Sequence, residues 1–223
     1  MAVKIFESKK HVFWQAFFLT VLFFFFGLVM GTYLEQSRAE ILNSNFYESE
    51  VLLYDSFALN NLIENPSISC EQLVRSNVRF ADRIYEEARE LERFDESSKL
   101  TQSIKTIHKK YDVLRTLLWI NVISVKEKCP NIVNSVVYLY IYDTEEISIR
   151  SEQAVWSKIL GDLKTERGSE VILIPIAVDQ GVNSLDSLND IYGINSFPSV
   201  IINEEHVISE IKTAKELGNY LIN

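Results

Sequence analysis

The longest apolar stretch of the chain runs from Val12 to Leu34 and contains no Asp, Glu, Lys or Arg. At about 1.5 Å of rise per residue, a helix of this length extends about 35 Å, more than the roughly 30 Å hydrocarbon core of a membrane. Trp14 and Tyr33 lie near its ends, where aromatic side chains suit the two membrane–water interfaces. This pattern predicts a transmembrane helix over residues 12–34. A cleaved signal peptide is the alternative, because lysines precede the stretch and Ser37-Arg38-Ala39 is similar to a cleavage site.

The charges on either side of this stretch predict its orientation. Lys4, Lys9 and Lys10 precede it, whereas the segment that follows is acidic. Because basic flanks stay on the cytoplasmic side, residues 1–11 are expected in the cytoplasm and everything after Leu34 outside it. The expected location is therefore the cell membrane, with a single span and an extracytoplasmic C-terminal part.

Residues 35–130 have the pattern of helices. The first part lacks glycine and proline up to Asn65-Pro66, which predicts that the membrane helix continues outward as a stalk. Ser69 followed by Gln72 is a capping-box pattern and predicts a helix start at about Cys70. A turn is expected at residues 95–98.

The helix expected after this turn has an apolar repeat with alternating spacings of four and three. Its members are Leu100, Ile104, Ile107, Tyr111, Leu114 and Leu118. The repeat predicts either an antiparallel helical hairpin that buries its own seam, or a coiled-coil surface that binds a partner.

Residues 131–223 alternate β-rich runs with helical segments. Strands are expected at about residues 136–142, 171–178, 199–202 and 207–210, and helices at about 151–164, 185–192 and 213–221. The order βαβαββα predicts two parallel strands joined by a crossover helix, followed by an antiparallel hairpin. The fold class expected for the chain is therefore α+β.

This element order, together with Pro198 directly before a strand, resembles the thioredoxin-like superfamily. In that family a cis-proline opens the third strand, and the surface beside it receives an extended peptide. The resemblance thus implies a cis Pro198, a candidate peptide-binding surface at Phe197 and Pro198, and the sheet order 4-3-1-2. Pro175 agrees with this order, because a proline inside the second strand cannot donate a ladder hydrogen bond and favours a sheet edge.

The resemblance does not extend to the family's redox chemistry. Thioredoxin-like oxidoreductases have Cys-x-x-Cys where the first strand meets the first helix, because the helix N-terminus lowers the pKa of the attacking thiol. Here the segment 143–152 contains no cysteine. Ser148 and Ser151 have the corresponding spacing, but a hydroxyl cannot perform thiol exchange, so no catalytic residue is expected. One of the two serines is instead expected to be the helix N-cap.

The two cysteines, Cys70 and Cys129, lie at the expected start of the second helix and end of the third. In an antiparallel hairpin these ends are close to the same level, and outside the cytoplasm such a pair is expected to form a disulfide. A structural bridge is the main interpretation. A redox-active pair is the alternative, because a cysteine at a helix start can have a lowered pKa.

No metal or other cofactor is expected. The three histidines, His11, His108 and His206, lack the spacing of zinc ligands. Several acidic residues follow the first two expected strands and can share one rim of the sheet, either as a solvated rim or as a cation site. These residues are Asp143, Glu145, Glu146 and Asp179.

Three functional hypotheses follow from these patterns. The first is a membrane-anchored, extracytoplasmic thioredoxin-like protein without a catalytic dithiol, acting as a protein-binding or assembly module in the cell envelope. The second is a thiol–disulfide oxidoreductase that uses Cys70 and Cys129, and the third is a spacer held off the membrane by the stalk. The net charge is −9 and no segment is basic enough to neutralise phosphates, so nucleic acid is not an expected partner. The sequence indicates no particular oligomeric state.

Overall fold

A computed structural model describes residues 9–61, 68–95 and 102–222. It divides the chain into two compact units, Met1–Ser44 and Asn45–Asn223. Three features expected from the sequence lie outside the described residues: positions 1–8 of the cytoplasmic segment, the end of the stalk at Pro66, and the turn at 96–98. The expected helical region 35–130 and the expected sheet region 131–223 share one compact unit from Asn45 onward.

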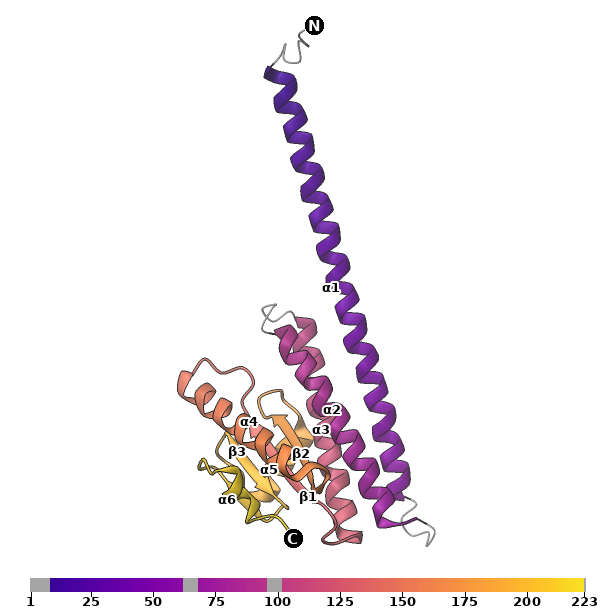
Figure 1. Ribbon diagram of the computed structural model, residues 1–223, viewed down its shortest axis with the longest axis vertical. Coiled ribbons are helices and arrows are strands. Elements are labelled where there is room, and N and C mark those ends of the chain that lie inside the picture. The colour runs from indigo at the N-terminus through magenta and orange to yellow at the C-terminus, as the bar shows by residue number, and fades with distance from the viewer. Residues whose placement is uncertain (1–8, 62–67, 96–101, 223) are drawn as a thin grey trace. The chain divides into compact units, whose positions relative to one another are not determined.

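The described part of the first unit, residues 9–44, is helical. Helix α1 extends without interruption from Lys9 to Asn61, so the expected continuation beyond Leu34 is confirmed (Figure 1). Among the described residues, one helical segment is long and apolar enough to cross a membrane. It is His11–Leu34, with a mean hydropathy of 2.2, and none of its residues is buried. This segment coincides with the apolar stretch identified in the sequence.

In the second unit, residues 45–61 of α1 pack with α2 (Cys70–Asp95) and α3 (Gln102–Lys128). The Ser69–Gln72 capping box is formed at the start of α2, where the Gln72 amide donates to Ser69 Oγ at 3.3 Å and the Ser69 amide donates to Gln72 Oε1 at 3.1 Å. The described members of the apolar repeat on α3 are buried within the chain: Ile107, Tyr111, Leu114 and Leu118. Leu100 and the side chain of Ile104 are not among the described parts.

Hydrogen bonds between buried side chains fix the register of these helices. The Ser49 hydroxyl of α1 donates to Glu87 Oε2 of α2 at 2.6 Å, and Asn121 Nδ2 of α3 donates to Asn77 Oδ1 of α2 at 2.7 Å. Ser49, Glu87 and the two asparagines are all nearly inaccessible to solvent. Because a buried polar group without a partner is costly, each such pair favours one alignment of its two helices.

The sheet has four strands in the order β2-β1-β3-β4. Strands β1 and β2 are parallel, and the β1–β3 and β3–β4 pairs are antiparallel. Pro175 lies in β2, at one edge of the sheet, where its missing N–H interrupts no ladder. The strands are β1 (Asn134–Tyr140), β2 (Val171–Ala177), β3 (Ser199–Ile202) and β4 (His206–Ile208).

Four helical segments complete the C-terminal part. They are α4 (Ile147–Arg167), a short 3₁₀ turn (Gly168–Glu170), α5 (Asn183–Tyr192) and α6 (Ala214–Gly218). Helix α4 starts four residues earlier than expected, and the last helix is shorter than expected. Thr213 caps α6 in a capping box with Glu216, and helical hydrogen bonding ends near Gly218.

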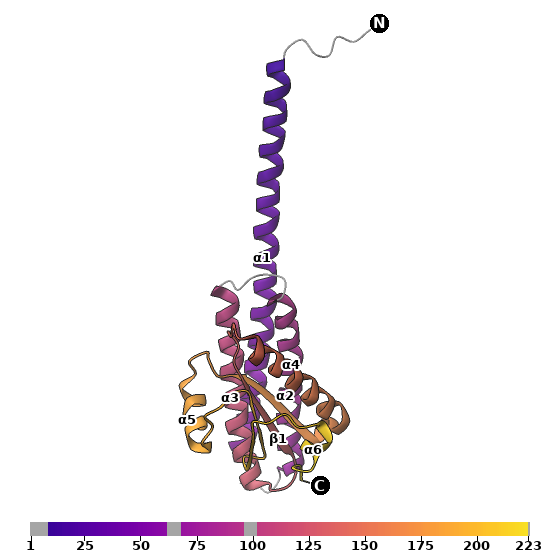
Figure 2. The same ribbon diagram turned by 90° about the vertical axis from the view of Figure 1, so that its left-hand side faces the viewer.

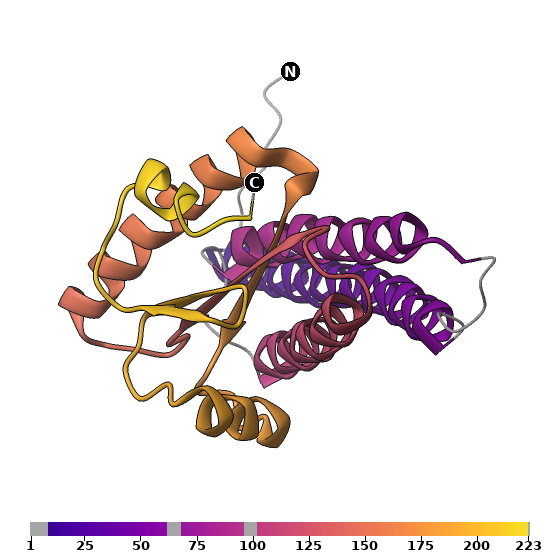
Figure 3. The ribbon, with the colours of Figure 1, turned by 90° about the horizontal axis from the view of Figure 1, so that it is seen from below.

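Helices cover both faces of the sheet (Figures 2 and 3). Helices α4 and α6 lie on one face, whereas α5 and α3 lie on the other, and α2 runs beside the β2 edge. The core under α4 and α6 contains alternate strand residues: Val136, Tyr138, Val171, Leu173, Val200 and Ile202. The intervening residues of the strands are also buried, on the opposite face: Val137, Leu139, Ile172, Ile174, Ile176 and Ile201. Burial on both faces explains why these strands are continuous apolar runs rather than alternating ones.

A polar cluster fastens α3 to the turn between β3 and β4. Glu204 in this turn pairs with Lys126 of α3 at 2.7 Å and accepts hydrogen bonds from Trp119 Nε1 at 3.0 Å and Ser135 Oγ at 2.7 Å. Asn203 and Glu204 both have positive φ, at 54° and 61°, which non-glycine residues rarely adopt. Their side-chain bonds to α3 and β1 stabilise this unfavourable backbone conformation.

Candidate functional site

The end of the sheet at which β1 stops and β3 starts contains the site suggested by the sequence. Leu139 of β1 is paired with Ser199 of β3, so Pro198 lies next to the last residue of β1. The Phe197–Pro198 peptide bond is cis. Pro198 is buried and Phe197 is half-buried. The hydroxyls of Ser196 and Ser209 form a hydrogen bond of 2.9 Å, which connects the segment before the proline to the residue directly after β4.

The loop between β1 and α4 is held by side chains from other elements. Gln153 of α4 accepts from the Ile141 amide at 2.8 Å and donates to the Ile141 carbonyl at 3.0 Å. Asp179, after β2, accepts from the amides of Tyr142 and Asp143 at 2.9 and 2.8 Å. These bonds satisfy backbone groups that would otherwise be unpaired in the loop.

Two of the four acidic residues at this rim have identified contacts. Asp179 binds backbone amides, and Asp143 forms an ion pair with Lys105 of α3 at 2.9 Å. Glu145 and Glu146 are exposed. In the part of the chain that the structure describes, no group of three His, Cys, Asp or Glu side chains is arranged to hold a metal ion. These contacts favour the solvated rim over the cation site.

Ser148 and Ser151 lie within the first turns of α4, and both are exposed. The expectation that one of them is the helix N-cap is wrong, because the cap position is Glu146, whose side chain makes no capping hydrogen bond. The loop contacts of Asp179 and Gln153, together with a bond of 3.2 Å from the Glu146 amide to Thr144 Oγ1, start the helix earlier than the apolar pattern suggested. The two positions at which the resemblance would place a dithiol therefore present exposed hydroxyls.

Cys70 and Cys129 form a disulfide with a Cα–Cα distance of 5.8 Å. Cys129 is 2% exposed, and the bridge packs in an apolar cluster with Leu73 and Val125. It precedes the N-terminal end of β1, whereas Pro198 lies at the other end of that strand. Seven residues of strand extend about 20 Å, so the bridge and the proline are far apart. The tertiary fold does not bring the two cysteines to the candidate site.

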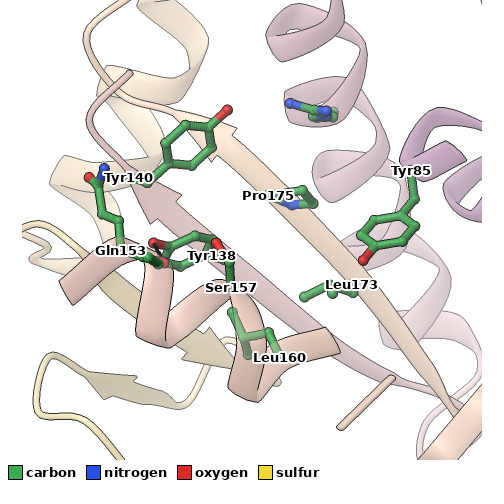
Figure 4. A pocket seen from close by; sticks show the side chains of 10 residues that line it. Tyr85, Tyr138, Tyr140, Gln153, Ser157, Leu160, Leu173 and Pro175 are labelled. Atoms are coloured by element: carbon green, nitrogen blue, oxygen red, sulfur yellow. Dashed lines mark hydrogen bonds between the residues drawn. The ribbon is translucent and has the colours of Figure 1, made fainter. Parts of the chain in front are cut away.

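A cavity of about 300 Å³ opens beside the β2 edge, close to the start of α4 (Figure 4). Tyr85 of α2 faces it from one side, Gln153 and Ser157 of α4 from the other, and Pro175 lies between. Tyr138 and Tyr140 of β1 contribute stacked rings whose centroids are 5.5 Å apart. Burial, followed by the neighbouring Tyr140, raises the pKa of the Tyr138 hydroxyl, which therefore remains a neutral hydrogen-bond donor.

A buried ion pair lies at the base of this region. Arg115 of α3 lines the cavity and contacts Asp112 Oδ1 at 3.1 Å, and the same oxygen accepts from the Ala177 amide at 3.2 Å. Burial raises the pKa of Asp112 to about 6, although the positive charge of Arg115 acts in the opposite direction. Sequence reasoning missed this region because its residues come from five elements. The only local signal was the placement of Tyr138 and Tyr140 on one face of a strand.

Comparisons with protein-family models, with curated proteins and with solved structures each gave no match to this chain.

Proposed function

We propose that this chain is a membrane-anchored, extracytoplasmic thioredoxin-like protein without a catalytic dithiol, and that it acts as a protein-binding or assembly module in the cell envelope. The observation that supports it most is the pairing, at one end of the sheet, of cis Pro198 with a helix start that has serines at the dithiol positions. The strand order, with one parallel pair and an antiparallel hairpin, supports the thioredoxin-like assignment.

Two further observations support the location. The apolar segment His11–Leu34 is long enough to span a membrane, and the lysines before it favour a cytoplasmic N-terminus. The Cys70–Cys129 disulfide is typical of a compartment that is more oxidising than the cytoplasm.

The proposed binding mode uses backbone groups next to Pro198. An extended peptide that lies beside Phe197 gains main-chain hydrogen bonds. Its side chains contact the residues that are exposed at this end of the sheet. Ile147, the first residue of α4, is 72% exposed and gives this surface an apolar contact. Exposed Ser148 adds a hydroxyl one residue further along. The expected client is therefore an extended segment with at least one apolar side chain.

The oxidoreductase hypothesis is less well supported by the geometry. Thiol exchange requires an attacking thiolate to reach one of the two sulfur atoms in line with the bridge. Cys129 is 2% exposed, Cys70 is half-buried, and the bridge packs against apolar side chains of α2 and α3. A largely buried bridge that joins two helix ends is the kind that resists reduction.

The experiment places a photo-crosslinking benzophenone amino acid at Ser148 or at Asn195 of the full-length protein in intact cells. Both positions are exposed at the candidate end of the sheet, and exposed Glu166, at the far end of α4, is the matched control. We expect one discrete adduct, of the same mass from both positions and absent from the control. Its yield should be unchanged in the Cys70→Ser/Cys129→Ser variant. Absence of the adduct contradicts the binding module, whereas insulin reduction by the wild type that disappears in the double variant supports the oxidoreductase.

A further inference from the structure

The outward face of α1 in the second unit is apolar, although the opposite face of the helix is already packed. Leu53 is 1% exposed against the other helices. On the outward face, Tyr47, Val51 and Tyr54 are 61, 66 and 61% exposed, and Ala58 is exposed as well. We call these four residues the α1 stripe. A helix that packs on one side normally directs polar residues to water on the other, so the stripe is unusual for a free surface.

A groove lies next to the α1 stripe, between α1 and α3. It has a volume of about 360 Å³ and a mostly apolar lining, with Leu53 and Tyr54 on α1, and Val113 and Leu117 on α3. Val113 is 36% exposed. Both helices are antiparallel to α2. Along α1 the bonds run from Ser49–Glu87 to Ser56–Ser76, and along α3 they run from Tyr111–Glu87 to Asn121–Asn77, so α1 and α3 run in the same direction. A third helix with a matching stripe would fit along this groove.

The spacing of the α1 stripe selects a helical occupant. Its residues are separated by four, three and four positions, which is the repeat of two helices that pack side by side in a coiled coil. In a parallel pair of identical helices, each stripe residue meets its own copy. The proposed membrane anchor, on which this inference rests, places all copies of α1 in one direction and so favours the parallel pair.

The charges beside the groove also match a second copy of this chain. Glu50 borders the groove on α1, and exposed Lys109 borders it on α3. The other two carboxylates of α1 in this unit, Glu48 and Asp55, lie at the side of the helix and pair with Arg83 and Arg79 of α2. When a second α1 lies along the groove, its Glu50 approaches Lys109, and the symmetric contact forms at the same time.

We propose that the α1 stripe and the groove beside it form the interface of a parallel homodimer, with α1 of a second copy as the occupant. Burying two tyrosines and a valine on each side removes from water the apolar surface that one copy leaves exposed. In this arrangement the dimer has two candidate binding sites, one at the end of the sheet in each copy.

The test uses disulfide crosslinking of the full-length protein in native membranes. In the described part of the chain no cysteine is free, and the sequence contains only the two bridged cysteines, so an engineered cysteine is the only free thiol. Tyr47→Cys and Ala58→Cys are made separately, with Asp55→Cys as the matched control on the side of the same helix. We expect each stripe variant to form a dimer on oxidation, with at least tenfold more yield than the control. The Glu50→Lys change should lower the yield severalfold, and adding Lys109→Glu should restore it.

Other outcomes overturn the inference or the membrane anchor on which it rests. An antiparallel pair crosslinks only when the Tyr47→Cys and Ala58→Cys proteins are mixed, because those positions lie about 16 Å apart along the helix. Monomers at both stripe positions, in protein that remains with the membrane after carbonate extraction, exclude the dimer but leave the anchor intact. Stripe crosslinks in protein that carbonate releases support the dimer and contradict the proposed anchor. A charge exchange that fails to restore crosslinking excludes the groove contact.

Discussion

At the scale of single residues, Asp112 has an unusual position. Asp112 belongs to α3, yet its carboxylate accepts a hydrogen bond from the amide of Ala177, the last residue of the edge strand β2. It also contacts Arg115 in its own helix. The side chain is fully buried. The bond to Ala177 aligns α3 with β2, but desolvation makes the charged form of the Asp112 carboxylate costly. The raised pKa of Asp112, about 6, reflects this balance.

The pKa of Asp112 predicts how stability depends on pH. The folded protein binds this proton more tightly than the unfolded chain does, because the pKa rises from 3.8 to about 6 on folding. The contribution of Asp112 to the free energy of unfolding is therefore greatest below about pH 4, falls as the pH rises to about 6, and is constant above that value. The Asp112→Asn variant should lack this fall. Urea denaturation between pH 4 and 7 measures the difference between variant and wild type.

The control for this experiment is Asp162→Asn, a change at an exposed carboxylate of α4. Its profile should follow that of the wild type. If Asp112→Asn also follows the wild type throughout the range, Asp112 does not titrate as a buried group.

At the scale of elements, α3 is connected to its neighbours at several points. The disulfide joins its C-terminal end to the start of α2, and the Lys126–Glu204 pair joins it to the β-hairpin turn. The stacked rings of Trp119 and Tyr192, 5.5 Å apart, add a contact with α5. The sheet also has a core under α4 and α6, made mostly by its own strands and these two helices, to which α2 adds Tyr85. Loss of one connection to α3 should therefore weaken the helical part before the sheet.

The Cys129→Ser variant should have a free energy of unfolding lower by roughly 2–5 kcal/mol, because the bridge closes a sequence separation of 59 residues and constrains the unfolded chain. Chemical denaturation measures this loss. Amide hydrogen exchange should show that β1 and β3 remain protected. Cys70→Ser and the double variant should lose about the same amount as Cys129→Ser, since all three remove one bridge. A variant as stable as the wild type would mean that the bridge contributes nothing to the fold.

At the scale of the whole molecule, the proposed membrane span before residue 35 predicts on which side of the membrane the rest of the chain lies. With the N-terminus in the cytoplasm, the disulfide, the cis-proline and the α1 stripe all lie outside it. With the opposite orientation, both cysteines would face a reducing compartment.

Cysteine labelling in intact cells tests this orientation. Ser187 is exposed on α5, so a Ser187→Cys variant should react with a membrane-impermeant maleimide without lysis. Ser8→Cys, on the other side of the predicted span, is the matched control and should react only after lysis. The reverse pattern of labelling would invert the topology and remove the proposed extracytoplasmic function.

The sequence by itself determined the features that depend on neighbours along the chain. The apolar segment, the capping box at Ser69 and Gln72, and the helical repeat up to Leu118 follow from local periodicity and local hydrogen bonding. The order of strands and helices along the chain could also be predicted. The start of α4 could not, because side chains from distant residues fix the loop between β1 and α4.

Only the tertiary structure decided which surfaces meet. An apolar face indicates that a helix is buried, but it does not indicate what covers it, so the packing of α2 and α3 against the sheet was not evident from the pattern. The same reason applies to the cavity beside Pro175 and to the Asp112–Arg115 pair, whose contacts join residues far apart in the sequence. The exposed apolar stripe on α1 is defined in the same way, because only the packed helices show which face of α1 remains outside.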